Sequence, residues 1–194
     1  NQLKEYENTT NSHQSQEIWA DSVAIDSEGI VGKFSSAVFD SNNYLHVAYF
    51  DETNGVLKYA NNGGFHDSGI SGEWANWTID GNMQEAQFTG ENYAWHSAGN
   101  YTSIAVDSND VIHITYQSLL YHTEDTSFIG SLKYASIGGA SQGGCDSTMP
   151  LSCQASTIEA DIGAVRESSI AFDSNDQIHV SYYNASNGNG GALN

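Results

Sequence analysis

Positive charge is scarce in this chain. Its 194 residues contain 24 Asp and Glu but only 5 Lys and Arg, giving a formal net charge of −19 at pH 7. Such a chain repels nucleic acid and anionic membrane surfaces, which excludes polyanionic partners. No apolar run approaches the length of a membrane span, so membrane insertion is not expected. The acidic residues are dispersed, as on a solvated surface, and the charge favours metal cations over anions.

Cysteine is scarcer still. The two cysteines, Cys145 and Cys153, lie in the Gly- and Ser-rich segment 138–153 without the neighbouring His or further Cys that a zinc site needs. The sequence therefore predicts a local disulfide, worth roughly 2–3 kcal/mol by loop entropy, which pins the loop rather than the fold. The chain starts at Asn1 without a charged-then-apolar leader, as in a mature or trimmed product. Together with four Asn-x-Ser/Thr sequons, these features predict a secreted or cell-surface protein, with candidate glycosylation at Asn8, Asn76, Asn100 and Asn184.

Repetition is what the chain has in abundance. Three ungapped copies of a fifteen-residue pattern begin at Ser35, Thr102 and Ser168. Their histidines recur with spacings of 67 and 66 residues. A fixed period of this kind predicts one supersecondary unit stacked beside copies of itself. The recurrent Ser, His and Tyr positions are Ser36, His46, Tyr49, Ser103, His113, Tyr116, Ser169, His179 and Tyr182.

Each copy predicts a β-hairpin, because apolar residues alternate on both sides of a short polar turn. With Asn42 and Asn43 at its tip, Phe39 would face His46 and Ser36 would face Tyr49. A third strand is predicted from Gly55 and from Gly130, and a fourth at 76–80 and at 156–160. No segment has helical periodicity. The predicted fold is therefore all-β, with propeller blades of four antiparallel strands.

The repeat S-I-A-x-D-S-N…H-I-x-Y…L-K-Y-A resembles the blades of secreted bacterial and archaeal β-propeller proteins, which are distantly similar in architecture to sialidase-type propellers. The resemblance covers nearly the whole chain. It implies a blade architecture but no particular activity, because such propellers serve in adhesion, carbohydrate binding and surface assembly as well as enzyme scaffolds. Sialidase activity is set aside because Arg166 is the sole arginine, whereas gripping a carboxylate in that way needs a cluster.

The ends of the chain look like two halves of one blade. The segment 1–33 resembles a third and fourth strand, and 161–194 resembles the first strands; between them lie blade one (34–80), an inserted loop (81–100) and blade two (101–160). The resulting total of about three blades per chain is below the typical four to eight of closed propellers. Three alternatives follow: a dimer that completes its split blades into one ring, an open head-to-tail polymer, or a piece of a longer propeller.

The recurrent residues admit more than one role. Three equivalent imidazoles suggest a metal or catalytic site, but they lie off the central axis and face apolar partners, which favours buried histidines held by hydrogen bonds between blades. The polar turns offer candidate calcium ligands, although Asp and Asn also favour turns through local hydrogen bonds and the Gly and Glu of an EF-hand loop are missing. These candidate ligands are Asp40, Asp107, Asn109, Asp110, Asp173, Asn175 and Asp176. No other cofactor is expected.

Two long insertions, 81–100 and 118–130, are predicted to emerge on the same face above blade two. They carry the candidate ligand-binding residues Tyr93, Trp95, His96, Tyr121, His122, Glu124 and Asp125. Flat aromatic rings beside carboxylates suit sugars, but interfaces are enriched in the same residues, so a subunit contact is an equal alternative.

The sequence thus predicts a non-catalytic extracellular recognition or assembly module, most concretely one that binds glycans at a cell surface. One alternative is a structural subunit of a filament or sheath that self-associates through its split blades. Another is a glycan hydrolase or lyase that uses unassigned carboxylates, since no spacing selects a catalytic pair among 24 acids.

Overall fold

The computed structural model describes residues 2–5, 8–10, 17–19, 22–63, 73–81, 93–122, 128–138, 153–160, 165–184 and 192–193. These residues form strands and short connections. None of them lies in a helix, and so none lies in a helix that could span a membrane. The all-β prediction is confirmed.

Two four-stranded antiparallel sheets form the centre of the molecule. The first sheet has the order β5 (Val31–Phe39), β6 (Leu45–Asp51), β7 (Val56–Asn61) and β8 (Ala75–Asp80). The second has the order β12 (Cys153–Glu159), β11 (Phe128–Ile137), β10 (Ile112–His122) and β9 (Tyr93–Val106). The third and fourth strands expected after each hairpin are therefore present, and chain order equals spatial order in both sheets.

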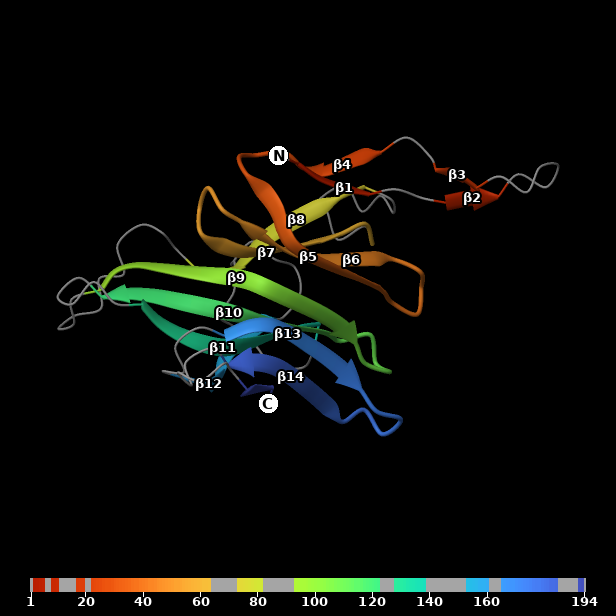
Figure 1. The fold of residues 1–194 in the computed structure, drawn as a ribbon. Helices are drawn as coiled ribbons and strands as arrows, with labels where there is room; N and C mark the ends of the chain where they lie inside the picture. The colour runs from red at the N-terminus through yellow and green to blue at the C-terminus, as the bar shows by residue number, and fades with distance from the viewer. Residues whose placement is uncertain are drawn as a thin grey trace.

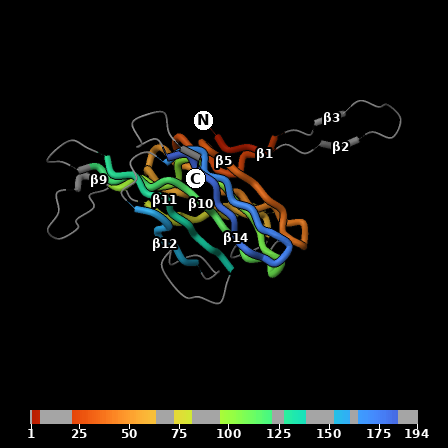
Figure 2. The backbone as a smooth tube through the Cα atoms, turned by 60° about the horizontal axis from the view of Figure 1, so that its bottom comes forward, coloured from red at the N-terminus to blue at the C-terminus, as the bar shows by residue number. Residues whose placement is uncertain are grey.

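Smaller groups of strands flank this pair of sheets. A third sheet consists of β13 (Val165–Phe172), β14 (Ile178–Asn184) and β15 (Ala192–Leu193). On the N-terminal side, β1 (Leu3–Glu5) pairs with β4 (Val23–Asp26), and β2 (Asn8–Thr10) pairs with β3 (Glu17–Trp19). Figure 1 shows the three sheets following one another in chain order, with the two termini at opposite ends. The first strands β5, β9 and β13 run side by side (Figures 1 and 2).

The main core lies between the first and second sheets. It joins Leu57, Trp77 and Ile79 of the first sheet to Ile104, Ile114 and Ile137 of the second, together with smaller neighbours. Each large apolar side chain that is fully buried contributes about 1.5–3 kcal/mol. This packing explains why a sheet that is unstable alone persists beside its copy.

The hairpin register differs by one residue from the prediction. Phe39 pairs with Leu45, and His46 pairs with Val38 rather than with Phe39. The cause is the turn: the Asp40 carboxylate accepts hydrogen bonds from the backbone N of Asn42 at 2.9 Å and of Tyr44 at 2.8 Å. Tyr44 is thereby drawn into the turn, while the left-handed residue is Asn43, with a φ of 63°.

The two insertions are not simple loops, which corrects the prediction. Residues 93–100 extend β9, and residues 118–122 and 128–130 extend β10 and β11, so the three strands pair well beyond the repeat. We call this extension, residues 93–100, 117–122 and 128–131, the arm. The second sheet accordingly starts at Tyr93 instead of residue 101. Within this extension Leu120 pairs with Ile129 and Tyr121 with Phe128.

The β1–β4 pair copies the geometry of β7–β8. Leu3 pairs with Asp26 before a one-residue shift, as Leu57 pairs with Asp80 before the same shift. A Cβ on Gly32 would lie 3.1 Å from the Leu3 Cα, just as one on Gly99 would lie 2.8 Å from the Leu57 Cα. The pair therefore stands before the first sheet in the same way that β7 and β8 stand before the second.

Candidate functional site

The first strand of each sheet carries a β-bulge at the same repeat position. In the first sheet, Phe34 and Ser35 of β5 lie opposite the single residue Tyr49 of β6. The equivalent bulged pairs are Tyr101 with Thr102 in β9 and Glu167 with Ser168 in β13. The first bulged residue has a left-handed φ in all three, 53° at Phe34, 53° at Tyr101 and 52° at Glu167. Such strain costs about 1–3 kcal/mol per residue and persists only where neighbouring structure enforces it.

In the first two sheets, a hydroxyl group of the following sheet binds the carbonyl oxygen of the first bulged residue. Thr102 donates a hydrogen bond to the carbonyl oxygen of Phe34, and Ser168 donates one at 2.7 Å to the carbonyl oxygen of Tyr101. The bulges therefore align along β5, β9 and β13. Phe34 and Tyr101 lie together with ring centroids 4.6 Å apart, and both rings are partly exposed.

A surface hollow of about 380 Å³ opens beside Tyr101, at the base of the arm. Its walls come from β9, β10, β11 and β13, and its lining residues are Asn100, Tyr101, Gln117, Leu119, Phe128 and Arg166. The hollow thus combines two aromatic rings, two carboxamides and one guanidinium, with no carboxylate among the lining residues. Its volume falls within the range of about 300–1,000 Å³ typical of small-molecule sites.

Arg166 is the only arginine of this acidic chain. Among the described residues it forms no ion pair or side-chain hydrogen bond. Lys58, by contrast, is held by the buried carboxylate of Asp26, and Lys133 by the half-buried carboxylate of Asp80. An exposed guanidinium presents up to five N–H donors in a planar fork, which suits the hydroxyl or carboxylate oxygens of a ligand.

The arm brings the predicted aromatic residues together. Trp95 pairs directly with Tyr121 across β9 and β10, and Tyr93 pairs with His122. The ring of Tyr121 lies 5.2 Å from that of Phe128 on the next strand. The two insertions therefore pair with each other as strands, and Phe128 connects the arm to the hollow.

The remaining candidates on the insertions differ in position. The Nε2 atom of His96 lies 2.7 Å from the Ser118 hydroxyl, and burial lowers the pKa of this histidine. His96 is thus a half-buried residue of the sheet. Glu124 and Asp125 lie outside the described residues, as does Cys145; its predicted disulfide partner Cys153 is buried at the start of β12.

The recurrent histidines form hydrogen bonds within their own sheets rather than between sheets. The Nδ1 atom lies 2.6 Å from the Tyr59 hydroxyl in His46, and 2.5 Å from the Tyr134 hydroxyl in His113. Burial lowers the pKa of both imidazoles. His179 differs, because its side chain is 65% exposed. The expectation of three buried histidines therefore fails at the third copy, where the described residues include no further sheet to cover it.

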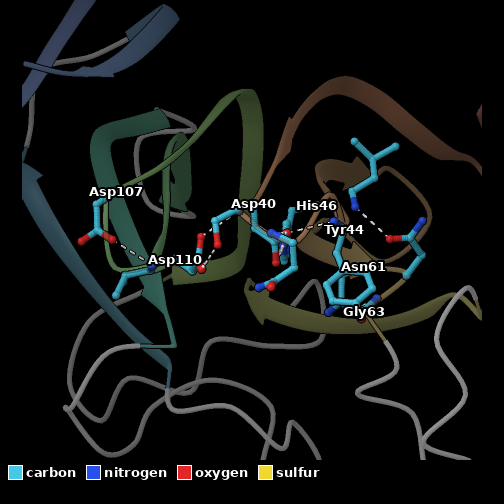
Figure 3. Close-up of polar contacts among 12 residues, drawn as sticks. Asp40, Tyr44, His46, Asn61, Gly63, Asp107 and Asp110 are labelled. Atoms are coloured by element: carbon cyan, nitrogen blue, oxygen red, sulfur yellow. Dashed lines mark hydrogen bonds and ion pairs between the residues drawn. The ribbon is translucent and has the colours of Figure 1, made fainter.

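The polar turns use their carboxylates for hydrogen bonds. Asp173 accepts from the backbone N of Gln177 and of Asn175, and these bonds lower its pKa. Asp107 accepts in the same way, whereas Asp110 and Asp176 accept from Ser41 and Ser108 of the preceding sheet. Figure 3 shows Asp110 reaching towards the turn of Asp40. Within the described ranges no three His, Cys, Asp or Glu side chains gather as a metal site. Calcium at these turns stays a prediction.

The four sequons lie in different environments. Asn76 is exposed on β8, Asn100 lines the hollow, and Asn184 is buried at the end of β14. Only the backbone of Asn8 is described. Glycosylation stays a prediction at each of them.

Sequence reasoning missed most of the hollow. Tyr101 stands one residue before the repeat, Phe128 is the last aromatic residue of the second insertion, and Arg166 drew attention only as a solitary arginine. Two sequence positions could have indicated the hollow. The position just before each copy is occupied by Phe34, Tyr101 and Glu167, and the position before that by the basic or amide residues Lys33, Asn100 and Arg166.

Comparison with known proteins yields a distant structural likeness. No protein-family model matches the chain, and no curated protein matches it. Among solved structures, the crystal structure of endo-arabinase from Bacteroides thetaiotaomicron VPI-5482 is similar, with 13% sequence identity and a TM-score of 0.43. The match covers 82% of this chain and 53% of that one, so the chain spans about half the length of the endo-arabinase. A likeness of this size assigns no activity.

Proposed function

We propose that this protein is an extracellular, non-catalytic carbohydrate-binding module built from propeller-type blades. The hollow at the base of the arm is the observation that carries the proposal. Tyr101 and Phe128 offer rings for the C–H faces of a sugar, while Asn100, Gln117 and Arg166 offer hydrogen-bonding groups for its hydroxyls.

The arm extends this surface beyond the hollow. Tyr121 contacts Phe128, and Trp95 lies opposite Tyr121 in the strand register. The neighbouring rings of Tyr121 and Phe128 offer an oligosaccharide a further stacking position, and the register places Trp95 on the adjoining strand. Because the strands fix the spacing of these residues, the ordering cost of binding is low.

The propeller interpretation has support from the repeated stacking of sheets in chain order. The first strands β5, β9 and β13 lie side by side, and the same contacts join successive sheets. In this proposal β1 and β4 are the third and fourth strands of a split blade and β13 and β14 are its first two, giving about three blades per chain. Secretion or surface display rests on the charge, the sequons and the predicted disulfide.

Binding is best tested on a glycan array, followed by titration calorimetry with the strongest ligand. We expect binding without release of reducing ends. Phe128→Ala and Trp95→Ala should each raise the dissociation constant by about tenfold or more, equivalent to about 1.4 kcal/mol, with little change in melting temperature. Ile158→Ala, which removes an exposed apolar side chain from β12, serves as the control and should leave affinity unchanged.

Three results would contradict the proposal. Unchanged affinity in both aromatic variants would move the site elsewhere. Turnover of the bound glycan would make the protein an enzyme. If the folded protein binds no glycan, the aromatic surface is instead a contact site for a protein partner.

A further inference from the structure

Successive sheets are joined by the same contacts at both junctions of the chain. In the turns, the Ser41 hydroxyl donates to Asp110 at 2.6 Å, and Ser108 donates to Asp176. Along the first strands, Ser36 accepts from the backbone N of Ile104 at 3.3 Å, and Ser103 accepts from that of Ile170 at 3.2 Å. The bulge contacts from Thr102 and Ser168 make a third repeated set.

An aromatic contact accompanies the second junction. The Phe172 ring of the third sheet lies 4.7 Å from the His113 ring of the second, in an edge-on arrangement. Phe39 and His179 are the residues at the same repeat positions on the two outer sheets. Phe39 is 58% exposed, and the His179 side chain is 65% exposed. The first sheet therefore presents an uncovered phenylalanine and the third an uncovered histidine.

The hydrogen-bonding groups at the two outer faces are complementary in the same way. Ser174 on the third sheet corresponds to Ser41 and Ser108, and it has no partner among the described residues. On the first sheet, Asn43 corresponds to their acceptors Asp110 and Asp176, with the same left-handed backbone. Ser35 likewise corresponds to the donors Thr102 and Ser168, and the carbonyl of Glu167 to the acceptors at Phe34 and Tyr101. Each missing half of a contact is present at the other end of the chain.

The charged groups at the two outer faces are complementary as well. Asp26 accepts from Tyr49 at 2.7 Å and pairs with Lys58 at 2.5 Å, and Asp80 binds Tyr116 and Lys133 likewise. The third carboxylate, Glu159, binds Tyr182 but has no lysine among the described residues. Lys4, which has the register of Lys58, donates only to the Ser22 hydroxyl within the described part of the chain.

From this complementarity we infer that a second copy of the chain docks head to tail, its first sheet and β1–β4 pair covering the third sheet of the first copy. Phe39 of one copy then lies on His179 of the other, as Phe172 lies on His113. Asn43 accepts from Ser174, and Lys4 reaches Glu159. Strand β1 takes the place beside β14 that β15 holds at Tyr183 and Asn184. This surface is distinct from the sugar hollow, so the inference does not depend on the proposed function.

Complementary blocking variants provide the test, read by sedimentation velocity over a range of concentrations without ligand. Wild type should self-associate, as a closed dimer or as a growing polymer, both of which follow from a head-to-tail contact. Phe39→Asp blocks the head and His179→Asp blocks the tail; both positions are exposed, so both variants should fold and remain monomeric. An equimolar mixture should form a dimer and nothing larger, because only one intact head and one intact tail can meet.

A gain-of-function variant adds a second readout. Asn43→Asp recreates the acceptor found at the two internal junctions and should lower the dissociation constant several-fold, whereas Asn43→Ala should raise it. Wild type that stays monomeric up to about 1 mM would overturn the inference. Blocking variants that still associate alone, or whose mixture stays monomeric, would overturn it too, since they indicate a contact through other surfaces.

Discussion

The ion pair between Asp26 and Lys58 should be the most costly charge contact to break in this protein. Asp26 lies on β4 and Lys58 on β7, with their charged atoms 2.5 Å apart and side-chain exposures of 2% and 11%. The fully buried Tyr49 also donates its hydroxyl to Asp26. Although burial alone would raise the pKa of Asp26, the bonds from Lys58 and Tyr49 lower it below its usual value.

The change Asp26→Asn removes this negative charge while keeping the shape of the side chain. Lys58 then keeps a charge that is shielded from water and has lost its counter-ion. Breaking one partner of a buried pair costs about 3–5 kcal/mol, a large part of a typical total stability of about 5–15 kcal/mol. Because Asp26 also joins the β1–β4 pair to the first sheet, we expect that pair to undock.

A second ion pair, between β5 and the turn after β6, supplies an exposed control. Lys33 and Glu52 lie 2.6 Å apart, but their side chains are 45% and 43% exposed. Glu52→Gln should therefore cost at most about 1 kcal/mol, since water screens the exposed charges. The two pairs have almost the same length, so the difference in expected cost comes from the burial of the first pair and the additional bond from Tyr49 to Asp26.

Urea unfolding followed by tryptophan fluorescence measures both free energies. The double variant Asp26→Asn with Lys58→Met should recover most of the loss, because a buried pair replaced by neutral side chains is often tolerated. The reasoning fails if Asp26→Asn costs no more than Glu52→Gln, or if the double variant is less stable than the single one.

Two further predictions concern protonation and packing. Burial lowers the pKa of His46 and His113, so the unfolded chain takes up protons at a higher pH than the folded one, and stability should fall as the pH drops below about 6.5. This fall can be measured as the urea midpoint between pH 8 and 5. The variant His46→Gln should make it shallower, and an unchanged profile would contradict the prediction. The depressed pKa of Asp26 and Asp80 adds a loss that starts only below about pH 4, as those carboxylates become protonated. Gly99→Ala places a Cβ 2.8 Å from the Leu57 Cα and should lower the melting temperature. Gly138→Ala is the control, because its φ is also positive but its nearest neighbour is 3.8 Å away, and it should lower the melting temperature less. Equal losses would show that the loss comes from backbone strain and not from the close contact.

Local patterns explain why the strands were predictable. The largely apolar segment VLKYAN and the repeated Asp-Ser-Asn turn act within a few residues of the chain, so the hairpins and the third strands follow from sequence. The one-residue error at Phe39 arose because a side-chain bond from Asp40 competes with the simplest two-residue turn. The arm was missed for a different reason: several pairs between 93–100 and 117–122 join a polar residue to an apolar one, such as Ser118 with Ala98 and Leu119 with Ser97, and this mixture obscures the strand pattern.

The sequence alone determined the repeat, the all-β architecture and the acidic surface, because composition and period-two alternation act locally on the backbone. Tertiary structure decided the bulges, the hollow and the burial of each histidine. Those features depend on bonds between residues about one repeat apart, such as Ser41 with Asp110, 69 residues away. A residue such as His179 has the sequence of a core position, yet it is exposed because burial requires a neighbouring sheet, and no pattern within one repeat specifies that neighbour.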